Sequence, residues 1–429
     1  MLNLLELINS LNQSDNHPEK VIQLFSQRMR ELYGSCATAL ICTEGLQPRE
    51  CRIVAMYDQH GEAVIENMSL SVEEDSGPFY QEQFITEILN PHEPVIYRGE
   101  SHGIHPIFVD RFHDYIDAIT LPLFEPNNVF RWLVLLFTSA NKVDDVDIER
   151  TLLVSTLASN YAMSVMNARK LQKANDWIQH ELEAIGRMQE LLLPQHLDNT
   201  PGVKVASYFS PHAFVGGDYY DVVNLSNIFD LKTPENDLDS WGVMIADASG
   251  HGAAAAVEIA MFDAILRTYK ANIDAGPGGV LTYANDHFFT RMSRGNFITT
   301  FVSSYVPQKQ TITYSNAGHP PPIHKSATGK ISYLDQAHGI PLGILHDFKW
   351  DSGNHDMLPG DLVVFFTDGI IEATSPSGEM FGQDRLEKLL LDNPSDPDTL
   401  IKIIQKEIEQ HQAGQPQRDD LTLILLLAL

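Results

Sequence analysis

Four acidic motifs in the second half of the chain hold the residues best suited to chemistry. In each motif, carboxylates stand beside turn-forming or hydroxyl residues at the edge of an apolar run, where a strand end can place a side chain in a site. Hard divalent cations such as Mg²⁺ and Mn²⁺ prefer such oxygen ligands. The pattern therefore predicts a carboxylate metal site. The motifs are Gly216-Gly217-Asp218-Tyr219-Tyr220-Asp221, Asp247-Ala248-Ser249-Gly250-His251-Gly252, Thr367-Asp368-Gly369 and Arg418-Asp419-Asp420-Leu421-Thr422.

Such a site can perform one reaction without a protein nucleophile. Two metal ions that share a carboxylate can activate a water molecule and stabilise an in-line displacement at phosphorus. The cysteines are Cys36, Cys42 and Cys51, so the second half has none, which excludes a cysteine phosphatase mechanism there. Their odd number and spacing fit no zinc motif and predict reduced thiols.

Composition and charge limit the partners. The 429 residues are 43% apolar and 20% charged, which is typical of a globular protein of two or three domains. A formal net charge of −28 would repel nucleic acid and anionic membranes. Residues 1–9 lack the basic start of a secretory signal, and no apolar run is long enough to span a bilayer. We expect a cytoplasmic protein with neither a nucleic-acid nor a membrane partner.

The first half mixes helix and strand signals. Its apolar spacing predicts a helix and then four strands, the last two forming a hairpin around Glu125-Pro126-Asn127-Asn128. A central antiparallel sheet with flanking helices fits this order. The predicted helix is Glu19–Leu32, and the strands are Thr38–Cys42, Cys51–Tyr57, Ala118–Phe124 and Phe130–Ser139.

Two further helical segments follow, Asp144–Met166 and Leu171–Leu193, with Pro194 expected to end the second. The second segment has an approximate heptad of apolar residues that is broken at Glu181. We favour a connecting helix that forms a homodimer over a helix that only packs on the next domain. The heptad residues are Leu171, Ala174, Ile178, Ile185, Met188 and Leu192.

Beyond the linker, strand signals dominate. Two helices are predicted, His251–Lys270 and Pro277–Arg291, and an acidic excursion at Ile228–Ser240 reads as a loop. Many strands with few helices predict a sandwich of sheets with helices outside. The strands are Val203–Ser210, Tyr219–Asn224, Trp241–Ala246, Phe297–Val306, Thr311–Asn316, Asp361–Thr367 and Leu421–Leu427.

The four motifs, in this order, resemble the PPM-type (protein phosphatase 2C-like) serine/threonine phosphatases of the SpoIIE/RsbU-like branch. The resemblance runs from about Glu183 to Leu429 and implies an α+β fold, a β-sandwich flanked by helices. Further segments contribute to it: Gln189-Glu190-Leu191-Leu192-Leu193-Pro194, Asn316-Ala317-Gly318-His319-Pro320, Pro341-Leu342-Gly343, Leu358-Pro359-Gly360-Asp361 and Phe381-Gly382.

The resemblance implies roles for individual residues and two bound ions, Mn²⁺ or Mg²⁺. Asp247 would bridge both ions. Asp218 and the carbonyl of Ala248 would join it at one ion, and Asp368 and Asp419 at the other. These carboxylates would catalyse hydrolysis through metal-bound water. The choice of Asp419 over Asp420 stays open.

Other residues of these motifs have supporting or ordinary interpretations. Asp420 and Asp221 would hold the loops around the ligands. Ser249 could instead be a helix N-cap followed by an exposed His251. Asn316 and His319 are expected to fix a loop. Many relatives grip phosphate with an arginine near the start of the domain, and residues 203–215 contain none.

The first half resembles a GAF domain, through Ile119-Thr120-Leu121-Pro122-Leu123-Phe124, the strand at Trp132–Phe137 and the long helix after it. The predicted organisation is an N-terminal segment at 1–16, a GAF-like sensor at 17–168 for an unknown small ligand or protein, a connecting helix at 169–197 and the phosphatase domain at 198–429.

The resemblance implies a protein phosphatase under control of the sensor. A phosphorylated STAS-type anti-sigma-factor antagonist is the implied substrate. Two alternatives stay open: a degenerate phosphatase domain that acts as a regulatory binding scaffold, and hydrolysis of a small phosphorylated metabolite.

Overall fold

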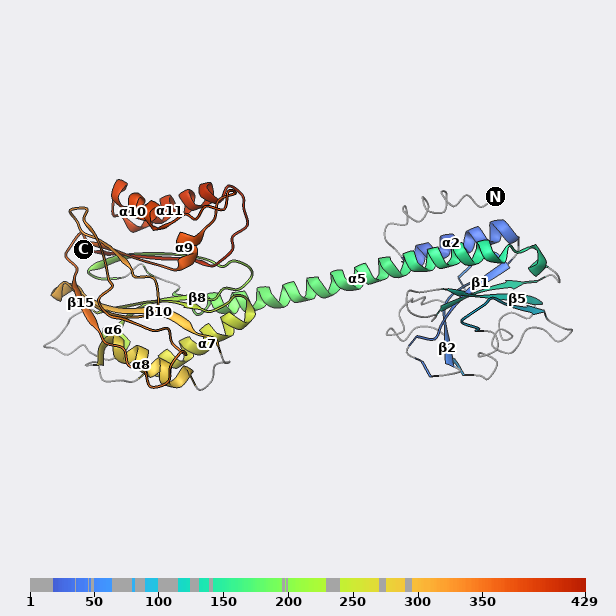
Figure 1. The fold of residues 1–429 in the computed structure, drawn as a ribbon, viewed down its shortest axis with the longest axis horizontal. Coiled ribbons are helices and arrows are strands. Elements are labelled where there is room, and N and C mark those ends of the chain that lie inside the picture. The colour runs from blue at the N-terminus through green and yellow to red at the C-terminus, as the bar shows by residue number, and fades with distance from the viewer. Residues whose placement is uncertain are drawn as a thin grey trace. The chain divides into compact units, whose positions relative to one another are not determined.

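The computed structural model divides the chain into two compact units, Met1–Asp176 and Trp177–Leu429 (Figure 1). The predicted N-terminal segment and the turn at residues 125–128 lie outside the described residues, as does nearly all of the excursion at 228–240. The structure describes residues 18–34, 36–44, 46–47, 50–63, 79–81, 89–98, 115–123, 131–138, 142–194, 197, 200–228, 240–269, 275–289 and 295–429.

The N-terminal unit is built on one six-stranded sheet with the order β3-β2-β1-β6-β5-β4. Every neighbouring pair is antiparallel, as the sequence predicted. Pro122 lies beyond the end of β4, where β5 is paired only with β6, so its missing N–H breaks no β4–β5 bond. The strands are β1 (Cys36–Cys42), β2 (Glu50–Tyr57), β3 (Phe79–Gln81), β4 (Val95–Arg98), β5 (Asp117–Leu123) and β6 (Arg131–Phe137).

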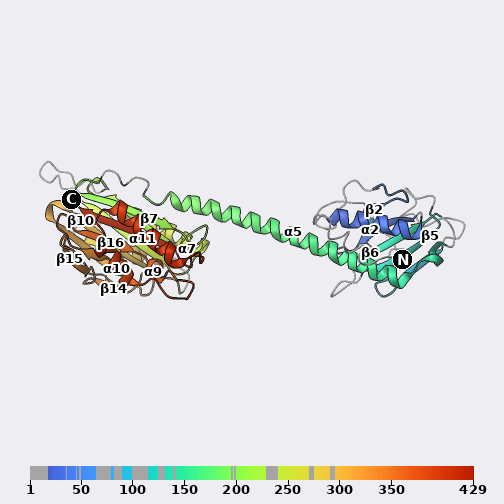
Figure 2. The ribbon, with the colours of Figure 1, turned by 90° about the horizontal axis from the view of Figure 1, so that it is seen from above.

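Helices α2 (Pro18–Tyr33) and the first part of α5 (Ile148–Glu190) cover one face of this sheet, after the short 3-10 turn η1 (Lys142–Asp145) (Figures 1 and 2). Phe25 and Met29 of α2 and Ala158 of α5 share one buried cluster with β1, β5 and β6. Alternate strand residues form a second buried cluster on the opposite face. Burial on both faces explains the nearly continuous apolar run of β1. The three cysteines are buried, and none of these described residues forms a disulfide.

The C-terminal unit is a sandwich of two sheets. One has the order β14-β11-β10-β9-β8, with β15 also paired to β11, and the other has the order β13-β12-β16-β17-β7. The strands of the first sheet are β8 (Asp218–Asn224), β9 (Trp241–Ala248), β10 (Ile298–Val306), β11 (Thr311–Ala317), β14 (His338–Gly339) and β15 (Gly353–Asp356). Those of the second are β7 (Val203–Ser210), β12 (Ile323–Lys325), β13 (Ile331–Tyr333), β16 (Leu362–Phe366) and β17 (Leu421–Ala428).

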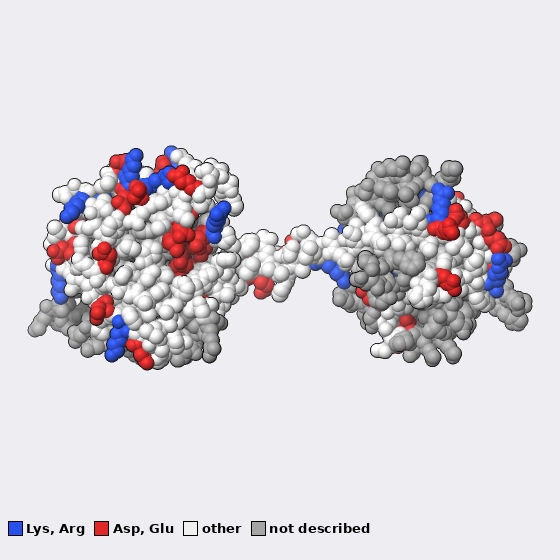
Figure 3. All heavy atoms as spheres, viewed as in Figure 1, with Lys and Arg blue, Asp and Glu red and all other residues white. Residues whose placement is uncertain are grey.

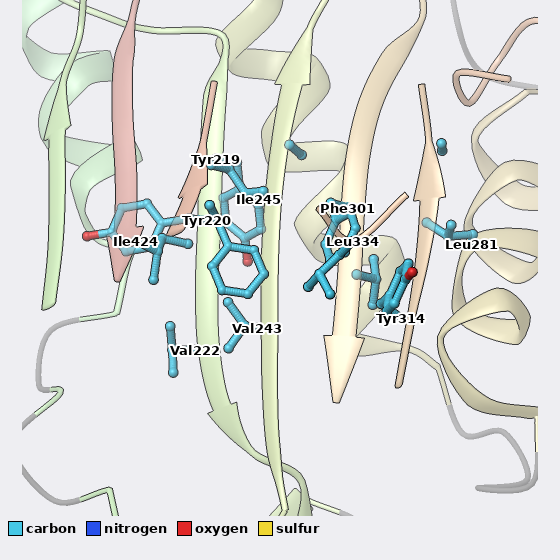
Figure 4. Packing of buried hydrophobic residues seen from close by; sticks show 14 of the residues in the cluster. Tyr219, Tyr220, Val222, Val243, Ile245, Leu281, Phe301, Tyr314, Leu334 and Ile424 are labelled. Carbon is cyan, nitrogen blue, oxygen red and sulfur yellow. The ribbon is translucent and has the colours of Figure 1, made fainter. Parts of the chain in front are cut away.

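Alternation along the central strands divides the core into two layers. Ile424 of β17 joins Phe301 of β10 and Ile245 of β9 in one cluster between the sheets (Figure 4). Phe365 of β16 belongs to the same cluster and packs edge to face on Phe301. Phe366 of β16 and the alternate leucines of β17 belong to the cluster under the outer helices. A residue period of two therefore places apolar side chains on both faces of this sheet.

Helices cover both outer faces of the sandwich, as predicted. α7 (Ala253–Arg267) and α8 (Gly276–Phe288) contact β8 to β11, while α10 (Gln383–Asp392) and α11 (Pro397–Gln412) contact β7, β12 and β17. The prediction of only two helices in this domain was wrong, since α10, α11 and the short helices α6 (Leu225–Ile228) and α9 (Asp368–Glu372) are also present. Helical spacing in α11 was a usable signal: Leu400, Ile404 and Ile408 recur every four residues and are buried.

The two predicted connecting segments form one helix. α5 continues from Ile148 to Glu190 without interruption. It ends before Pro194, through a turn at residues 191–193 that carries three backbone hydrogen bonds, so proline is not its stop. α7 likewise starts at Ala253, two residues after the predicted start. Among the residues that the structure describes, no helix is long and apolar enough to cross a membrane.

Candidate metal centre

Strand register brings the first two predicted ligands together. Asp218 is the first residue of β8, and Asp247 stands one residue before the end of β9. The two strands are antiparallel, and Asp218 and Asp247 are direct partners in their register. Side chains of such partners lie within a few ångströms of each other, so the pair is a necessary consequence of this hairpin.

The second sheet supplies the other two aspartates at the same end of the sandwich. Asp368 opens α9 after a single intervening residue, Thr367, that follows β16, and Asp419 stands two residues before β17. β16 and β17 are antiparallel, and Thr367 N donates to Thr422 O at 3.2 Å, so these ends lie together. The carbonyl oxygen of Asp420 would lie 2.0 Å from a Cβ at Gly369. Only glycine permits this approach of α9 to β17.

The carboxylates from the two sheets interact electrostatically and therefore form one centre. Burial, followed by the charges of Asp368 and Asp419, raises the pKa of Asp247 to about 8. Burial, Asp419 and Glu372 raise the pKa of Asp368. Carboxylates without a compensating cation repel one another in this way. Acidic side chains also gather in a patch on the face of the C-terminal unit seen in Figure 3.

Asp218 is the most deeply held of the four, with 2% of its surface exposed. Its Oδ2 accepts hydrogen bonds from Thr367 Oγ1 at 2.7 Å and from Thr422 Oγ1 at 2.5 Å. Burial and the charge of Asp247 raise its pKa well above the ordinary value, and the two threonines oppose that rise. Both hydroxyls come from β16 and β17, so the second sheet orients a carboxylate of the first. The sequence motifs contained both threonines, but their role was not predicted.

Neighbouring Asp419 and Asp420 have different surroundings. Asp420 Oδ1 accepts from His212 N at 2.6 Å, and its Oδ2 accepts from Gly217 N at 2.5 Å and Asp218 N at 3.3 Å. A Cβ at Gly216 would lie 2.7 Å from this carboxylate. Asp420 therefore fixes the loop before β8, as expected of it. Because its oxygens are occupied by backbone donors, the geometry favours Asp419 as the ligand, and this assignment stays a prediction.

Three other expectations have different outcomes. Asn316 and His319 do fix their loop, through paired bonds of 2.8 and 2.9 Å between the Asn316 amide and the His319 backbone. Ser249 is not the N-cap of α7, because Gly252 holds that position and Ser249 Oγ accepts from Phe297 N at 2.9 Å. His251 is exposed.

Among the described residues, the partners of Asp221 lie on its own strand and on α7, so its expected role in holding a ligand loop is not seen. It accepts from Val222 N at 2.9 Å within β8. Burial raises its pKa, and Arg267 of α7 opposes that rise. Asp221 therefore belongs to the packing of β8 on α7, where Arg267 Nε also donates to Asp263 at 2.8 Å.

Two residues near the centre were not predicted to act on it. Glu372, one turn after Asp368 on α9, adds negative charge to both Asp247 and Asp368. No motif marked it, although its i+4 spacing from Asp368 was visible. Gln189, near the end of α5, donates through Nε2 to Gly216 O at 2.8 Å and accepts from Gly216 N at 3.0 Å. It also donates to Asp218 O at 3.3 Å, so α5 contacts the segment that carries a predicted ligand.

The donor set fits hard divalent cations in its chemistry. Asp218, Asp247, Asp368 and Asp419 offer only oxygen atoms, and their uncompensated charge favours a cation. Among the described residues, no three His, Cys, Asp or Glu side chains are already grouped as a metal site. Mg²⁺ suits such a site because it keeps several water ligands.

Comparisons with known proteins agree with this reading. The family model for Stage II sporulation protein E (SpoIIE) matches residues 237–428. This range contains Asp247, Asp368 and Asp419 and begins after Asp218. The C-terminal unit is therefore similar to the SpoIIE family over residues 237–428, and this similarity supports a serine/threonine phosphatase domain.

Two curated relatives and one solved structure cover similar stretches. The phosphoserine phosphatase RsbU of Bacillus subtilis is 27% identical over 62% of this chain and 75% of its own length. Protein IcfG of Synechocystis is 26% identical over 57% of this chain and 41% of its own length. The SiaA-PP2C domain of Pseudomonas aeruginosa has a TM-score of 0.49 and 19% identity, covering 60% of this chain and 98% of that domain.

Proposed function

We propose that this chain is a metal-dependent protein phosphatase that hydrolyses phosphoserine or phosphothreonine on a signalling protein. The observation that carries this proposal is the cluster around Asp247, where burial and two further aspartates raise its pKa to about 8 within a SpoIIE-type domain. Strongly perturbed carboxyl groups in one cluster are typical of functional sites. The relative RsbU is a phosphoserine phosphatase by name, which supports the same reaction class.

Each residue has a defined task in this proposal. Asp218, Asp247 and the Ala248 carbonyl would hold one divalent ion, and Asp247, Asp368 and Asp419 the other. When bound, Mg²⁺ or Mn²⁺ would supply Lewis-acid activation of water and neutralise charge at phosphorus. Thr367 and Thr422 orient Asp218, and Asp420 fixes the loop that leads to it. These contacts limit how far the Asp218 side chain and its loop must move to coordinate a metal ion.

The substrate we propose is a phosphorylated STAS-type anti-sigma-factor antagonist in the cytoplasm. The family resemblance of the motifs supports this choice. The high net negative charge is compatible with a protein partner and unfavourable for nucleic acid.

We also propose that the N-terminal unit is a GAF-like sensor, at residues 17–168, that controls the phosphatase domain at 198–429 through the helix at 169–197. The antiparallel sheet with flanking helices supports the sensor. The contact of Gln189 with Gly216 and Asp218 supports the helix as the route of control. A shift of this helix between two positions would change the position of Asp218 relative to the other predicted metal ligands.

Homodimerisation through α5 belongs to the same proposal. Leu171 and Ile178 occupy equivalent heptad positions and are 63% and 49% exposed. Burial of such a stripe against a second copy would remove this apolar surface from water. A monomeric mass for the full chain in solution would contradict it.

The test is release of phosphate from a phosphoserine protein and from p-nitrophenyl phosphate, with Mn²⁺, Mg²⁺ or EDTA. We expect activity with either metal, none in EDTA, and loss in Asp247→Asn. The matched control is Asp392→Asn on an exposed position of α10, which should behave as wild type. Biological function that survives Asp247→Asn would instead support the binding scaffold, and faster turnover of nucleotides or sugar phosphates would support a metabolite phosphatase.

A further inference from the structure

The carboxylate centre needs a partner group to accept an anionic substrate. The proposed cations would neutralise part of the charge of a phosphoryl group, and hydrogen-bond donors beside the centre would orient its remaining oxygens. The segments that carry or adjoin the centre are 210–217, 248–252, 317–320, 367–372 and 417–420. Within them the only lysine or arginine is Arg418, and the only histidines are His212, His251 and His319.

His319 cannot serve this purpose. It is 4% exposed. Its ring nitrogens lie 3.0 Å from Thr299 Oγ1 and 3.1 Å from Phe366 O, so both are occupied. Burial lowers its pKa to about 3, which keeps the ring neutral. His319 is therefore part of the loop structure.

His212 and His251 are exposed and face each other. Their ring centroids are 6.0 Å apart, and the rings meet edge to face at 73°. The two residues come from separate loops, one leading into β8 and the other following β9. Their meeting is thus a product of the same β8–β9 hairpin that pairs Asp218 with Asp247.

Both loops are tied to the centre. Asp420, the neighbour of Asp419, holds the His212 backbone N–H through Oδ1 and that of Gly217 through Oδ2. On the other side, a Cβ at Gly217 would lie 3.1 Å from the carbonyl oxygens of Ala248 and Gly250. His251 follows Gly250 directly. The two imidazoles are therefore carried on backbone that packs around the predicted ligands.

We propose that His212 and His251 together bind the phosphoryl group of the substrate at the metal centre. An imidazole has at least one N–H donor in either protonation state. Two donors on adjoining loops can reach different oxygens of one phosphoryl group. This inference rests on the proposed phosphatase function and names the groups that hold its substrate.

The experiment measures binding of inorganic phosphate to the full chain by calorimetry in the presence of Mn²⁺, together with KM and kcat for p-nitrophenyl phosphate. The variants are His212→Gln, His251→Gln and the double variant. The control is His60→Gln, at an exposed histidine of the N-terminal unit. Arg418→Gln tests the one other cation of these segments.

Each single histidine variant should weaken phosphate binding about 10-fold and raise KM by a similar factor, because a hydrogen bond to a charged group is lost. Mn²⁺ affinity and the His60→Gln control should stay within about twofold of wild type. The losses should be non-additive in the double variant, since the two rings share one ligand.

Three results would overturn the inference: unchanged phosphate affinity in both single variants, a loss confined to Arg418→Gln, or no phosphate binding to wild type. Failure of the proposed function has a different signature. A wild-type chain that binds phosphate through both histidines but hydrolyses no phosphoester would refute the phosphatase and leave the binding site intact.

Discussion

The carboxylate centre and a histidine cluster elsewhere in the same sandwich both bury charged groups, yet they treat them in opposite ways. The histidine cluster comprises His324, Ser332, His355 and Asp361. Asp361 is 3% exposed, and its oxygens accept from Ala327 N at 2.8 Å and Leu358 N at 2.9 Å and lie 3.1 Å from His324 Nε2. Every charge there has a partner.

Asp247 of the carboxylate centre lacks this compensation. The groups that act most strongly on Asp247 after burial are other carboxylates, and they raise its pKa to about 8. A buried charge with donors stabilises the fold locally, whereas one surrounded by like charges destabilises it until a cation arrives. The difference separates a structural cluster from a site that awaits a ligand.

The largest expected effect is on catalysis at the centre. Asp247→Asn should lower metal-dependent phosphate release by at least about 100-fold, since it removes the shared ligand that positions the reacting groups. Phosphate release at saturating Mn²⁺ measures it. If the variant retained more than half of the wild-type rate, Asp247 would have no role in the mechanism. The contrast between the carboxylate centre and the histidine cluster would then fail.

The next effect is on stability at the histidine cluster. Asp361→Ala should lower the free energy of unfolding of the C-terminal unit by about 3 kcal/mol, because it leaves buried donors of two backbone amides and His324 unsatisfied. Urea unfolding measures the loss. Activity per folded molecule should not change. If activity falls while stability holds, the cluster is part of the site instead.

The stability of the metal-free carboxylate centre should depend on pH in a way that the histidine cluster does not explain. The pKa of Asp247 is raised on folding, so the folded state binds the extra proton and its stability is greatest at acid pH. In EDTA, stability should therefore fall as pH rises from about 5 towards 8, by about 1 kcal/mol per pH unit.

Differential scanning calorimetry at several pH values would measure this slope. The unfolding transition of the C-terminal unit is identified as the one that Asp361→Ala shifts. Saturating Mn²⁺ should reduce it, because the cation replaces the proton, and Asp247→Asn should abolish this contribution. An equal slope in wild type and Asp247→Asn would show that the carboxylates do not repel one another as the structure indicates.

The smallest effect should come from the end of α5. Gln189→Leu removes the hydrogen bonds to Gly216 and Asp218, and we expect metal-dependent activity to fall about 10-fold through misplacement of Asp218. Gln172→Leu is the matched control on the same helix, since Gln172 donates to Asp176 in an exposed position. Equal activities of the two variants would argue against control through this contact.

Local sequence patterns predicted the presence of helices and strands better than the residues at which they begin and end. Strands such as β7 and β17 were found within a residue, because alternation and apolar runs are local signals. α10 and α11 were missed although their amphipathic spacing was present. α5 was divided into two although Asn167 to Lys170 permit an unbroken helix.

Within the site, sequence identified the acidic motifs but not the contacts among them. That Asp420 would fix a loop was expected, and it does so through His212 and Gly217, more than 200 residues away. Thr367 and Thr422 hold Asp218, and Glu372 adds charge to Asp247, and neither role was predicted. Such contacts depend on which strand ends meet.

The sequence by itself determined the chemical type of this protein: hard oxygen donors at strand ends, no cysteine in the second half, and a two-layer apolar pattern that supports a sandwich. Only the tertiary structure decided which oxygens are occupied and which are available. β8 pairs with β9 and β16 with β17, and this register brings the segments that carry the four aspartates together. The motifs determine which oxygen donors are present, but the burial of these donors and the charges around them arise only when the two sheets pack.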